Sequence, residues 1–569
     1  MEATSPDLTL RQFQIPMADG INLAADLYLP DGDDGPWPAL LAMTPYGKQN
    51  LGGALAQAFA PRGYAVLTVD VRGRYESAGD FRPLVQERAD APAVCEWIAA
   101  QPWFDRDAGI GTIGLSYLAT AGFMAAAGSP WVKAATAVTV IVDLASGLFT
   151  GGVLNLHHAL PWFIITGLSP QPDLTEWDWT QLYKHVPLAT LDEAAALDLP
   201  AWRESLVEAY DSTQDPAKLS IRSELRDCKV PVLHLAGWYD FILGESLAAY
   251  GALADAGAAP QAMVLGPWTH KTIVDGRTRL GDRDYGPEAS SRLMERLLGW
   301  FDYWLQGKGQ PVQGVQAYLT GGAGWRHLPA WPPPDAKTLR LGLAPDSAEM
   351  DGIDLAGTGW GGNALHTLTA TAVVSDGWLS YSYDPDDPTP TIGGAVWPFS
   401  AASLEPGPAD QRALAGRSDG LTFLTPPLTD DVDVLGPARV KLVAATDTPD
   451  TDFAVRLFDA APNGGWEIIG DGIARARYRE GFHLGKSPER LLRPGETFEL
   501  EVDLAAVGHR FARGHRIGLH VSGANFPKFA RNLNTGGHPL WEDGTREATQ
   551  RIRTGASALY LTLAPPADD

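Results

Sequence analysis

The fold of this chain is decided by one stretch, Gly111-Thr112-Ile113-Gly114-Leu115-Ser116-Tyr117-Leu118-Ala119. We expect an apolar strand to end at Ser116 and a helix of small residues to follow, from Ala119 to Ala127. A serine at such a strand–turn–helix junction is a nucleophile elbow, in which the turn lifts the hydroxyl above the sheet. The motif is imperfect, because Leu118 stands where a glycine is usual. Taken alone, the stretch fits a serine in an ordinary tight turn equally well.

Around this stretch, short apolar runs alternate with helical segments. Near-continuous Val, Ile, Leu and Ala runs separated by helices indicate a parallel sheet buried on both faces. The expected strands are Ile21–Leu29, Pro38–Met43, Tyr64–Asp70, Gly109–Leu115 and Ala134–Val142.

The pattern then changes twice along the chain. From about residue 147 to 226 strand signals vanish and apolar residues recur at helical spacing, which predicts a helical insertion. Strand-like runs resume at 230–236 and 262–265, and a helix is expected over 291–306. The run Trp331-Pro332-Pro333-Pro334-Asp335 marks a domain boundary, because a proline run continues neither a helix nor a central strand. Many short alternating strands beyond it predict a sandwich or jelly roll.

Two later strand ends carry the residue types that a serine nucleophile needs. Asp240 follows the run Gly237-Trp238-Tyr239, and His270 follows Gly266-Pro267-Trp268-Thr269. In an open parallel sheet, sites form at the carboxyl ends of strands. The chain order Ser, Asp, His is also that of α/β-hydrolase enzymes. A lone Asp or His here would be read as a loop or capping residue, but three such residues in order favour a catalytic triad.

These motifs resemble the cocaine-esterase and X-Pro dipeptidyl-peptidase superfamily of serine hydrolases, and its cocaine-esterase branch most. The family's elbow is Gly-x-Ser-Tyr-x-Gly, and this chain has Gly114-Leu115-Ser116-Tyr117-Leu118-Ala119, so the last Gly is Ala119. Further similar stretches span nearly the whole chain: Pro45-Tyr46-Gly47-Lys48, residues 70–74, 237–240 and 266–270, 384–388, 474–479, 522–527 and 531–536.

The resemblance implies an α/β-hydrolase domain with an inserted helical cap, followed by a C-terminal all-β jelly-roll domain. With the patterns above, it places the α/β-hydrolase domain at residues 1–142 and 230–334, the cap at 143–229 and the jelly roll at 335–569.

Catalytic roles are assigned residue by residue. Ser116 attacks the acyl carbon, His270 takes and returns the proton, and Asp240 holds the imidazole tautomer. The backbone N–H of Tyr117 is one oxyanion donor, and the resemblance adds the hydroxyl of Tyr46 as the second.

Aromatic side chains are the candidates for the substrate pocket. We expect Trp162, Phe241 and Trp397 to contact the acyl or leaving group, although with 19 tryptophans a core role is the default for any one of them. Asp70 and Arg72, at a strand end, are expected to form a buried ion pair that braces the elbow.

The composition limits which classes of binding partner are expected. Lys and Arg number 44 against 69 Asp and Glu, a formal charge of −25, which disfavours nucleic acid and anionic membranes. No signal peptide is visible in residues 1–7 and no long apolar run follows, so we expect a cytoplasmic protein. Neither a metal nor another cofactor is expected, and a homo-oligomer stays open.

Three functions compete at this point. Phe241, Ile242 and Leu243 follow Asp240, so the pocket lacks the extra carboxylates with which family members bind an α-amino group. We therefore predict an esterase for neutral, apolar or aromatic acyl groups. The alternative is an amide or peptide hydrolase of the same fold, either an X-Pro dipeptidyl-peptidase or an acylase. A non-catalytic protein that binds carbohydrate or a partner through the jelly roll is the third hypothesis.

Overall fold

The structure is a computed structural model of the chain. It describes residues 9–566 except 31–34, 169–170, 211–218, 258, 349–352, 354, 356–363, 372, 374–375, 400–403, 463 and 483–487. Residues 1–7, which carry the expectation of no signal peptide, therefore lie outside the described residues.

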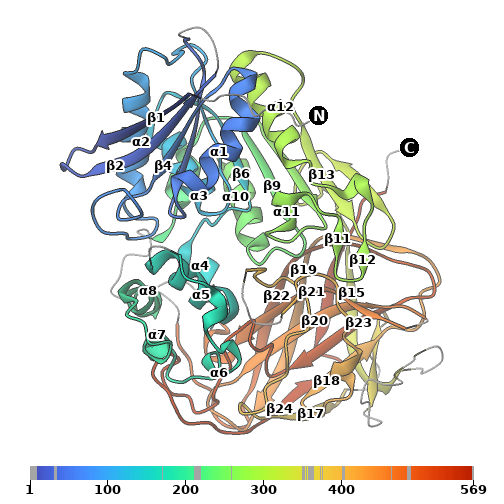
Figure 1. Cartoon of the computed structure of the whole chain (residues 1–569). Helices are drawn as coiled ribbons and strands as arrows, with labels where there is room; N and C mark the ends of the chain where they lie inside the picture. Colours follow the sequence, from blue (N-terminus) through green and yellow to red (C-terminus); the bar gives the residue numbers. More distant parts are fainter. Residues whose placement is uncertain are drawn as a thin grey trace.

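A ten-stranded sheet forms the α/β domain, at the top of Figure 1. Its strand order is β1-β2-β4-β3-β5-β6-β9-β10-β13-β14. The pairs from β4 to β13 are parallel, and the pairs at both edges are antiparallel. The strands are β1 (Thr9–Pro16), β2 (Asn22–Leu29), β3 (Ala39–Thr44), β4 (Ala65–Asp70), β5 (Ile110–Thr112), β6 (Val132–Val138), β9 (Val232–Gly237), β10 (Gln261–Gly266), β13 (Gly314–Leu319) and β14 (Gly324–Leu328).

Helices cover both faces of this sheet, as the unbroken apolar strands require. Successive strand residues face opposite sides, and a Cβ on Gly111 would meet Phe301 of α12 (Leu293–Gln306), whereas Gly122 of α3 (Tyr117–Gly128) abuts Thr112. α12 and α3 therefore lie on opposite faces. α1 (Lys48–Phe59) joins α12 through the contact of Phe59 with Phe301, and α2 (Glu87–Ala99) packs on α3.

The strands differ from their predicted extents in physically simple ways. β5 ends at Thr112, before the predicted Leu115, because the chain turns there into the elbow. β1 and β14 are the edge strands of the sheet, and β13 lies next to β14. None of the three was predicted, and the two edge strands are exposed or half-buried over most of their length, which weakens their apolar signal.

Helices dominate the segment between β6 and β9, which we call the cap. Its helices are α4 (Leu144–Leu148), α5 (Leu156–Gly167), α6 (Trp179–Leu182), α7 (Leu191–Ala194), α8 (Pro200–Tyr210) and α9 (Arg222–Asp227). The segment is not wholly without strands, since β7 (Phe149–Thr150) and β8 (Val153–Leu154) form a short hairpin. α5 is its most buried helix, with residues such as Leu156, Leu160 and Ile164 at 0% exposure.

The C-terminal part, which we call the β-domain, is built almost wholly of strands (Figure 1). They are β15 (Thr338–Ser347), β16 (Leu365–Thr369), β17 (Trp378–Tyr383), β18 (Gly420–Leu424), β19 (Val432–Thr446), β20 (Asp452–Ala460), β21 (Trp466–Arg475), β22 (Thr497–Phe511), β23 (Arg516–Ser522), β24 (Ala548–Arg553) and β25 (Ala558–Leu563). The first half of β22 alternates exposed and buried residues, as the alternating strands expected in this part of the chain should. All pairs in this sheet are antiparallel except β16 with β18. The predicted fold class is confirmed.

Main-chain hydrogen bonds fasten the cap to the β-domain. Such bonds fix position without depending on side-chain rotamers, and they occur at four places along the cap. They run from Arg475 N to Gly151 O (2.9 Å), from Ala530 N to Leu154 O (2.8 Å), from His157 N to Lys528 O (3.3 Å) and from Ala189 N to Leu540 O (3.1 Å).

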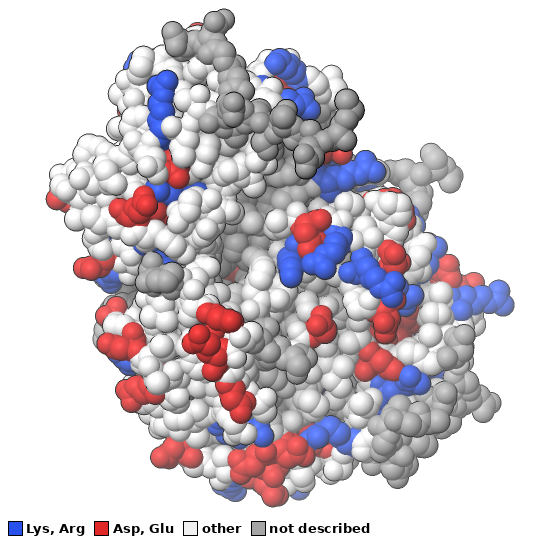
Figure 2. Space-filling view, in the orientation of Figure 1, with Lys and Arg blue, Asp and Glu red and all other residues white. Residues whose placement is uncertain are grey.

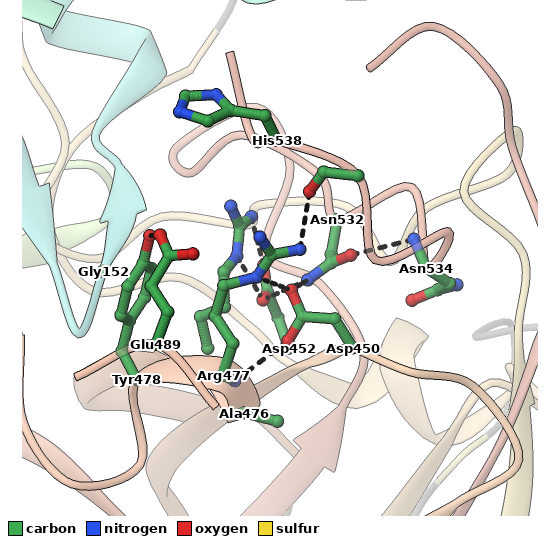
Figure 3. A network of polar contacts seen from close by, with 12 residues as sticks. Gly152, Asp450, Asp452, Ala476, Arg477, Tyr478, Glu489, Asn532, Asn534 and His538 are labelled. Carbon is green, nitrogen blue, oxygen red and sulfur yellow. Dashed lines mark hydrogen bonds and ion pairs between the residues drawn. The ribbon is translucent and has the colours of Figure 1, made fainter. Parts of the chain in front are cut away.

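A buried ionic network holds the β-domain segment to which the cap is fastened. Arg475 bonds Asp452 at 2.8 and 3.0 Å, and Arg477 bonds Asp450 at 2.7 Å. Asn532 donates to both carboxylates, at 3.1 and 2.8 Å. Figure 3 shows Asp450, Asp452, Arg477 and Asn532 converging on one centre. Because every charge is paired and all five side chains are buried, the network fixes this segment to the strands beneath it.

The surface reflects the net charge. Figure 2 shows acidic side chains gathered over the cap and along the lower edge of the β-domain on this face. Among the described residues, the helices are too short or too polar to cross a bilayer.

Candidate active site

The elbow at Ser116 is a strained turn held by main-chain bonds. Ser116 adopts φ 55° and ψ −122°, a conformation that non-glycine residues rarely take, directly before the first residue of α3. Its N–H donates to the carbonyl of Val138 at 2.9 Å, so the turn is anchored to the end of β6. Such backbone conformations persist only where the surrounding structure enforces them. Here the turn places the serine side chain above the carboxyl ends of β5 and β6.

Close packing behind the elbow explains one glycine and one alanine. A Cβ on Gly114 would lie 2.3 Å from the carbonyl oxygen of Thr136 and 2.5 Å from Cα of Ala119. Gly114 therefore cannot be substituted without moving the elbow. Ala119, which replaces the family glycine, is buried at 1% exposure against Gly114, so the structure accommodates its methyl group.

Asp240 and His270 lie together at the ends of β9 and β10. The Nδ1 of His270 is 3.0 Å from Oδ2 and 3.3 Å from Oδ1 of Asp240, and both side chains are buried. The two loops are tied by a bond from Tyr239 N to Trp268 O. The backbone N–H of Ile242 donates to Oδ1 of Asp240 at 3.0 Å, which fixes the carboxylate plane.

Residues at the end of β6 contact both Ser116 and His270. Val138 accepts the N–H of Ser116, and the next residue, Thr139, has its Oγ1 3.3 Å from Nδ1 of His270. Thr139 is fully buried and held at φ 47°. The three residues predicted from strand ends thus share one edge of the sheet.

Tyr46 stands at the end of β3, the strand next to β5. The indole Nε1 of Trp162, on α5, donates to the Tyr46 hydroxyl at 3.0 Å. A phenol has one proton and two lone pairs, so by accepting from Trp162 it keeps its proton for another acceptor. Burial raises the pKa of Tyr46 to about 12, which keeps that proton in place at neutral pH. Trp162, predicted to contact substrate, thus contacts the second predicted oxyanion donor.

The other predicted donor, the backbone N–H of Tyr117, begins α3, and its side chain is anchored below the elbow. The Tyr117 hydroxyl donates to Oε1 of Glu87 in a short hydrogen bond and accepts the N–H of Leu84 at 3.1 Å. Glu87 is 2% exposed, and Oε2 has no hydrogen-bond partner among the described residues. Burial raises the pKa of Glu87 to about 7.

Glu87→Gln should change how stability depends on pH. A raised carboxyl pKa means that the folded state holds a proton that the unfolded state releases, so wild-type stability falls as pH rises from about 4.5 to about 7. Glutamine does not titrate, and the Tm of the variant minus that of wild type should therefore increase between about pH 5 and about pH 8. Glu96→Gln, at an exposed site on the same helix, is the control with a constant difference. Parallel Tm curves for Glu87→Gln and wild type would contradict this expectation.

A cavity of about 260 Å³ lies beside the acid, where the α/β domain, the cap and the β-domain meet. Phe241 and Trp397 both line it, together with Asp240. The Phe241 ring is 5.0 Å from that of His270, and Phe399, which contacts Trp397, is 6.3 Å from the same imidazole. The β-domain therefore reaches the catalytic histidine candidate. Ser116, Tyr46 and Trp162 are not among the described residues that line this cavity.

Polar residues in the cavity wall were not found from the sequence. Lys528 contacts both carboxylate oxygens of Asp471 at 2.8 Å, and both residues line the cavity. The His158 ring contacts that of Phe241 in a tilted arrangement, with ring centroids 4.6 Å apart, and burial lowers the pKa of His158 to about 3, so it is neutral. Asp471 lies in β21 and Lys528 follows β23, so both are far along the chain from Ser116. No local sequence pattern therefore links them to the predicted nucleophile.

One predicted contact is wrong. Arg72 pairs with Asp90 at 2.6 Å and with Asp19 at 2.6 Å, and not with Asp70. Asp70 instead accepts the backbone N–H of Lys48 at 2.6 Å. The two side chains diverge because Asp70 is the last residue of β4, whereas Arg72 lies in the loop that follows and points toward α2.

In the part of the chain that the structure describes, no three or more His, Cys, Asp or Glu side chains are grouped to hold a metal ion.

Known proteins are similar to this chain in architecture and in sequence. Residues 19–272 match the family described as X-Pro dipeptidyl-peptidase (S15 family), and residues 302–561 match the X-Pro dipeptidyl-peptidase C-terminal non-catalytic domain. The cocaine esterase of Rhodococcus sp. (strain MB1 Bresler) is 34% identical over 553 residues, covering 92% of each chain. The chain belongs to the cocaine-esterase and X-Pro dipeptidyl-peptidase superfamily of serine hydrolases.

Solved structures of this superfamily fold extend the comparison. An α-amino acid ester hydrolase superposes with a TM-score of 0.83 at 25% identity, covering 99% of this chain and 98% of the other. An aminopeptidase from the marine sediment archaeon Thaumarchaeota archaeon gives a TM-score of 0.82 at 22% identity over 99% and 98% of the chains, a likeness of fold. As a member of the superfamily this chain is a hydrolase, and its relatives named for ester hydrolysis support a serine ester hydrolase.

Proposed function

We propose that this protein is a carboxylic ester hydrolase that works through an acyl-enzyme on Ser116, with His270 as general base and then general acid, and Asp240 as the carboxylate that orients His270. The observation that carries the proposal is the hydrogen-bonded Asp240–His270 pair, buried at the same sheet edge as the strained Ser116 turn. Its partner is a small-molecule ester.

The steps follow from what each group can do. His270 removes the hydroxyl proton of Ser116 as the oxygen attacks the acyl carbon, and Asp240 stabilises the imidazolium that forms. The Tyr117 N–H and the Tyr46 phenol donate to the oxyanion of the tetrahedral intermediate. His270 then gives the proton to the departing alkoxide, and a water molecule repeats the sequence to release the acid.

The surroundings favour a neutral acyl group. The aromatic rings of Phe241 and Trp397 supply apolar surface in the cavity beside His270. Four carboxyl groups line this cavity, and each already has a partner: Asp240 pairs with His270, Asp471 pairs with Lys528, Glu245 accepts the backbone N–H groups of Val142 and Asp143, and Asp503 accepts that of Ala505. An ammonium on the substrate would lose water and would have to compete with these partners for a counter-charge, which costs binding free energy.

A matched pair of substrates tests this preference. We expect kcat/KM for p-nitrophenyl butyrate to exceed that for p-nitrophenyl 2-aminobutyrate by about 100-fold, after correction for spontaneous hydrolysis. The two acyl groups differ only by the ammonium. Equal rates, or a preference for the amino ester, would reject the neutral-acyl assignment. Turnover of butyryl p-nitroanilide at a rate similar to the ester would instead support the amide-hydrolase alternative.

Tyr46→Phe should lower kcat for p-nitrophenyl butyrate by about 100- to 1,000-fold, because it removes one oxyanion donor and leaves the ring in place. KM should change little, since the hydrogen bond strengthens only as charge develops on the oxygen. Tyr64→Phe is the control, because Tyr64 is a buried tyrosine directly before β4, at the end of that strand away from the site, and its hydroxyl donates to Asp302. A Tyr46→Phe variant within a few fold of wild type would exclude the phenol as a donor.

A further inference from the structure

Arg74 is a buried cation with an unusual set of partners. Its side chain is 3% exposed and donates to three backbone carbonyls: Nε donates to Pro45 O at 3.0 Å, and Nη2 donates to Ile165 O at 3.2 Å and Leu168 O at 3.0 Å. The side chain also interacts with that of Tyr75. The rings of Tyr75 and Phe81 lie 5.3 and 5.7 Å from the guanidinium carbon.

Two of these carbonyls close the cap helix α5. The last carbonyls of a helix have no partner within it and carry the negative end of the helix dipole. A guanidinium with several donors in a fixed plane satisfies both and complements their charge. Arg74, from the loop after β4, thereby fixes the C-terminus of α5 to the α/β domain.

The third carbonyl belongs to the segment that carries Tyr46, the predicted oxyanion donor. Pro45 directly precedes Tyr46, whose hydroxyl accepts the Nε1–H of Trp162. Trp162 lies on α5, about one turn before the residues that Arg74 contacts. The same helix thus holds Tyr46 at two points, through Arg74 at the backbone and through Trp162 at the hydroxyl.

We propose that Arg74 is a positioning residue for the oxyanion hole: by joining Pro45 to the C-terminus of α5, it fixes where the Tyr46 hydroxyl lies and where its proton points. Arg74 touches neither substrate nor the reacting atoms. The inference rests on the proposed ester hydrolysis, and it extends that proposal by making the cap a part of the catalytic geometry.

A double-mutant cycle separates positioning from general stability. Arg74→Met should lower kcat for p-nitrophenyl butyrate by about 10- to 100-fold with KM within about twofold, because a displacement of about 1 Å at such a donor is costly. In a Tyr46→Phe background, where no hydroxyl is left to position, the same substitution should lower kcat by less than about twofold. Arg74→Lys, which keeps a charge at the end of α5, should give an intermediate loss.

Arg516→Met is the matched control, since Arg516 is buried in the β-domain and its guanidinium also donates to a backbone carbonyl, that of Thr425. It should lower Tm and leave kcat within about twofold of wild type. If Arg74→Met does not fold, Arg74→Lys takes its place in the double-mutant cycle, and its loss of kcat is again compared between the wild-type and Tyr46→Phe backgrounds.

Equal losses from the Arg74 substitution in both backgrounds, or a raised KM with unchanged kcat, would overturn the inference alone. An inactive wild type, or a Ser116→Ala variant as active as wild type, would overturn the proposed function and this inference with it.

Discussion

Ser116→Ala is expected to lower kcat for p-nitrophenyl butyrate by roughly 10⁴- to 10⁶-fold. The substitution removes the attacking oxygen, and nothing else in the elbow replaces it. A residual rate above that in water should remain, because the oxyanion donors and the binding cavity are unchanged. The measurement is steady-state release of p-nitrophenol by purified wild type and variant, prepared in parallel.

The variant should keep the fold, since the backbone N–H of Ala can donate the same bond to the carbonyl of Val138, and Ala is no more hindered than Ser at φ 55°. Tm within a few degrees of wild type therefore has to accompany the loss of turnover. Ser129→Ala, at the other end of α3, is the control for removing a hydroxyl from this helix. A Ser116→Ala enzyme that retains wild-type turnover would refute the nucleophile and with it the proposed acyl-enzyme.

Asp240→Asn should lower kcat by about 10⁴-fold at neutral pH while changing the shape of the site little. The backbone N–H of Ile242 points at Oδ1, so the amide oxygen of Asn will take that position. Its NH₂ group will then take the place of Oδ2, 3.0 Å from Nδ1 of His270. Donation from the amide to Nδ1 moves the imidazole proton to Nε2, where the ring can no longer accept the proton of Ser116.

The control is Asp105→Asn, because Asp105 accepts backbone N–H groups from Asp107 and Ala108 in a loop away from the site. Its kcat should equal that of wild type. If Asp240→Asn retained more than about a tenth of wild-type kcat, the role of Asp240 in setting the tautomer would be wrong, and another acid would have to be sought.

The strand ends made much of the site predictable from sequence. Ser116, Asp240 and His270 each follow an apolar run, and parallel strands bring their carboxyl ends to one edge, so position along the chain translates into proximity. The fold class of the other two parts was predictable for a different reason: the periodicity of apolar residues reports which side of a helix or strand is buried, and β22 alternates as a half-buried strand should.

What could not be predicted depends on contacts between segments far apart in the chain. Arg72 and Arg74 stand two residues apart in one motif, yet Arg72 pairs with Asp19 and Asp90 while Arg74 contacts carbonyls of α5. Carbonyl groups carry no side-chain signature, so no sequence pattern could assign them to Arg74. The hydrogen bond from the Trp162 N–H to the Tyr46 hydroxyl likewise joins residues 116 positions apart in the chain, and the sequence pattern carries no signal for it. Contact of the Trp162 ring with substrate stays a prediction.

The bonds between the cap and the β-domain have a consequence for how this chain can be divided. The catalytic histidine candidate contacts Phe399, and cap and β-domain share main-chain hydrogen bonds on both sides of α5. A fragment ending before β15 would expose those carbonyl and N–H groups and would lose one wall of the cavity beside Asp240. The β-domain is therefore part of the structure around the candidate site and no detachable accessory, and we expect a fragment that ends before β15 to lose activity.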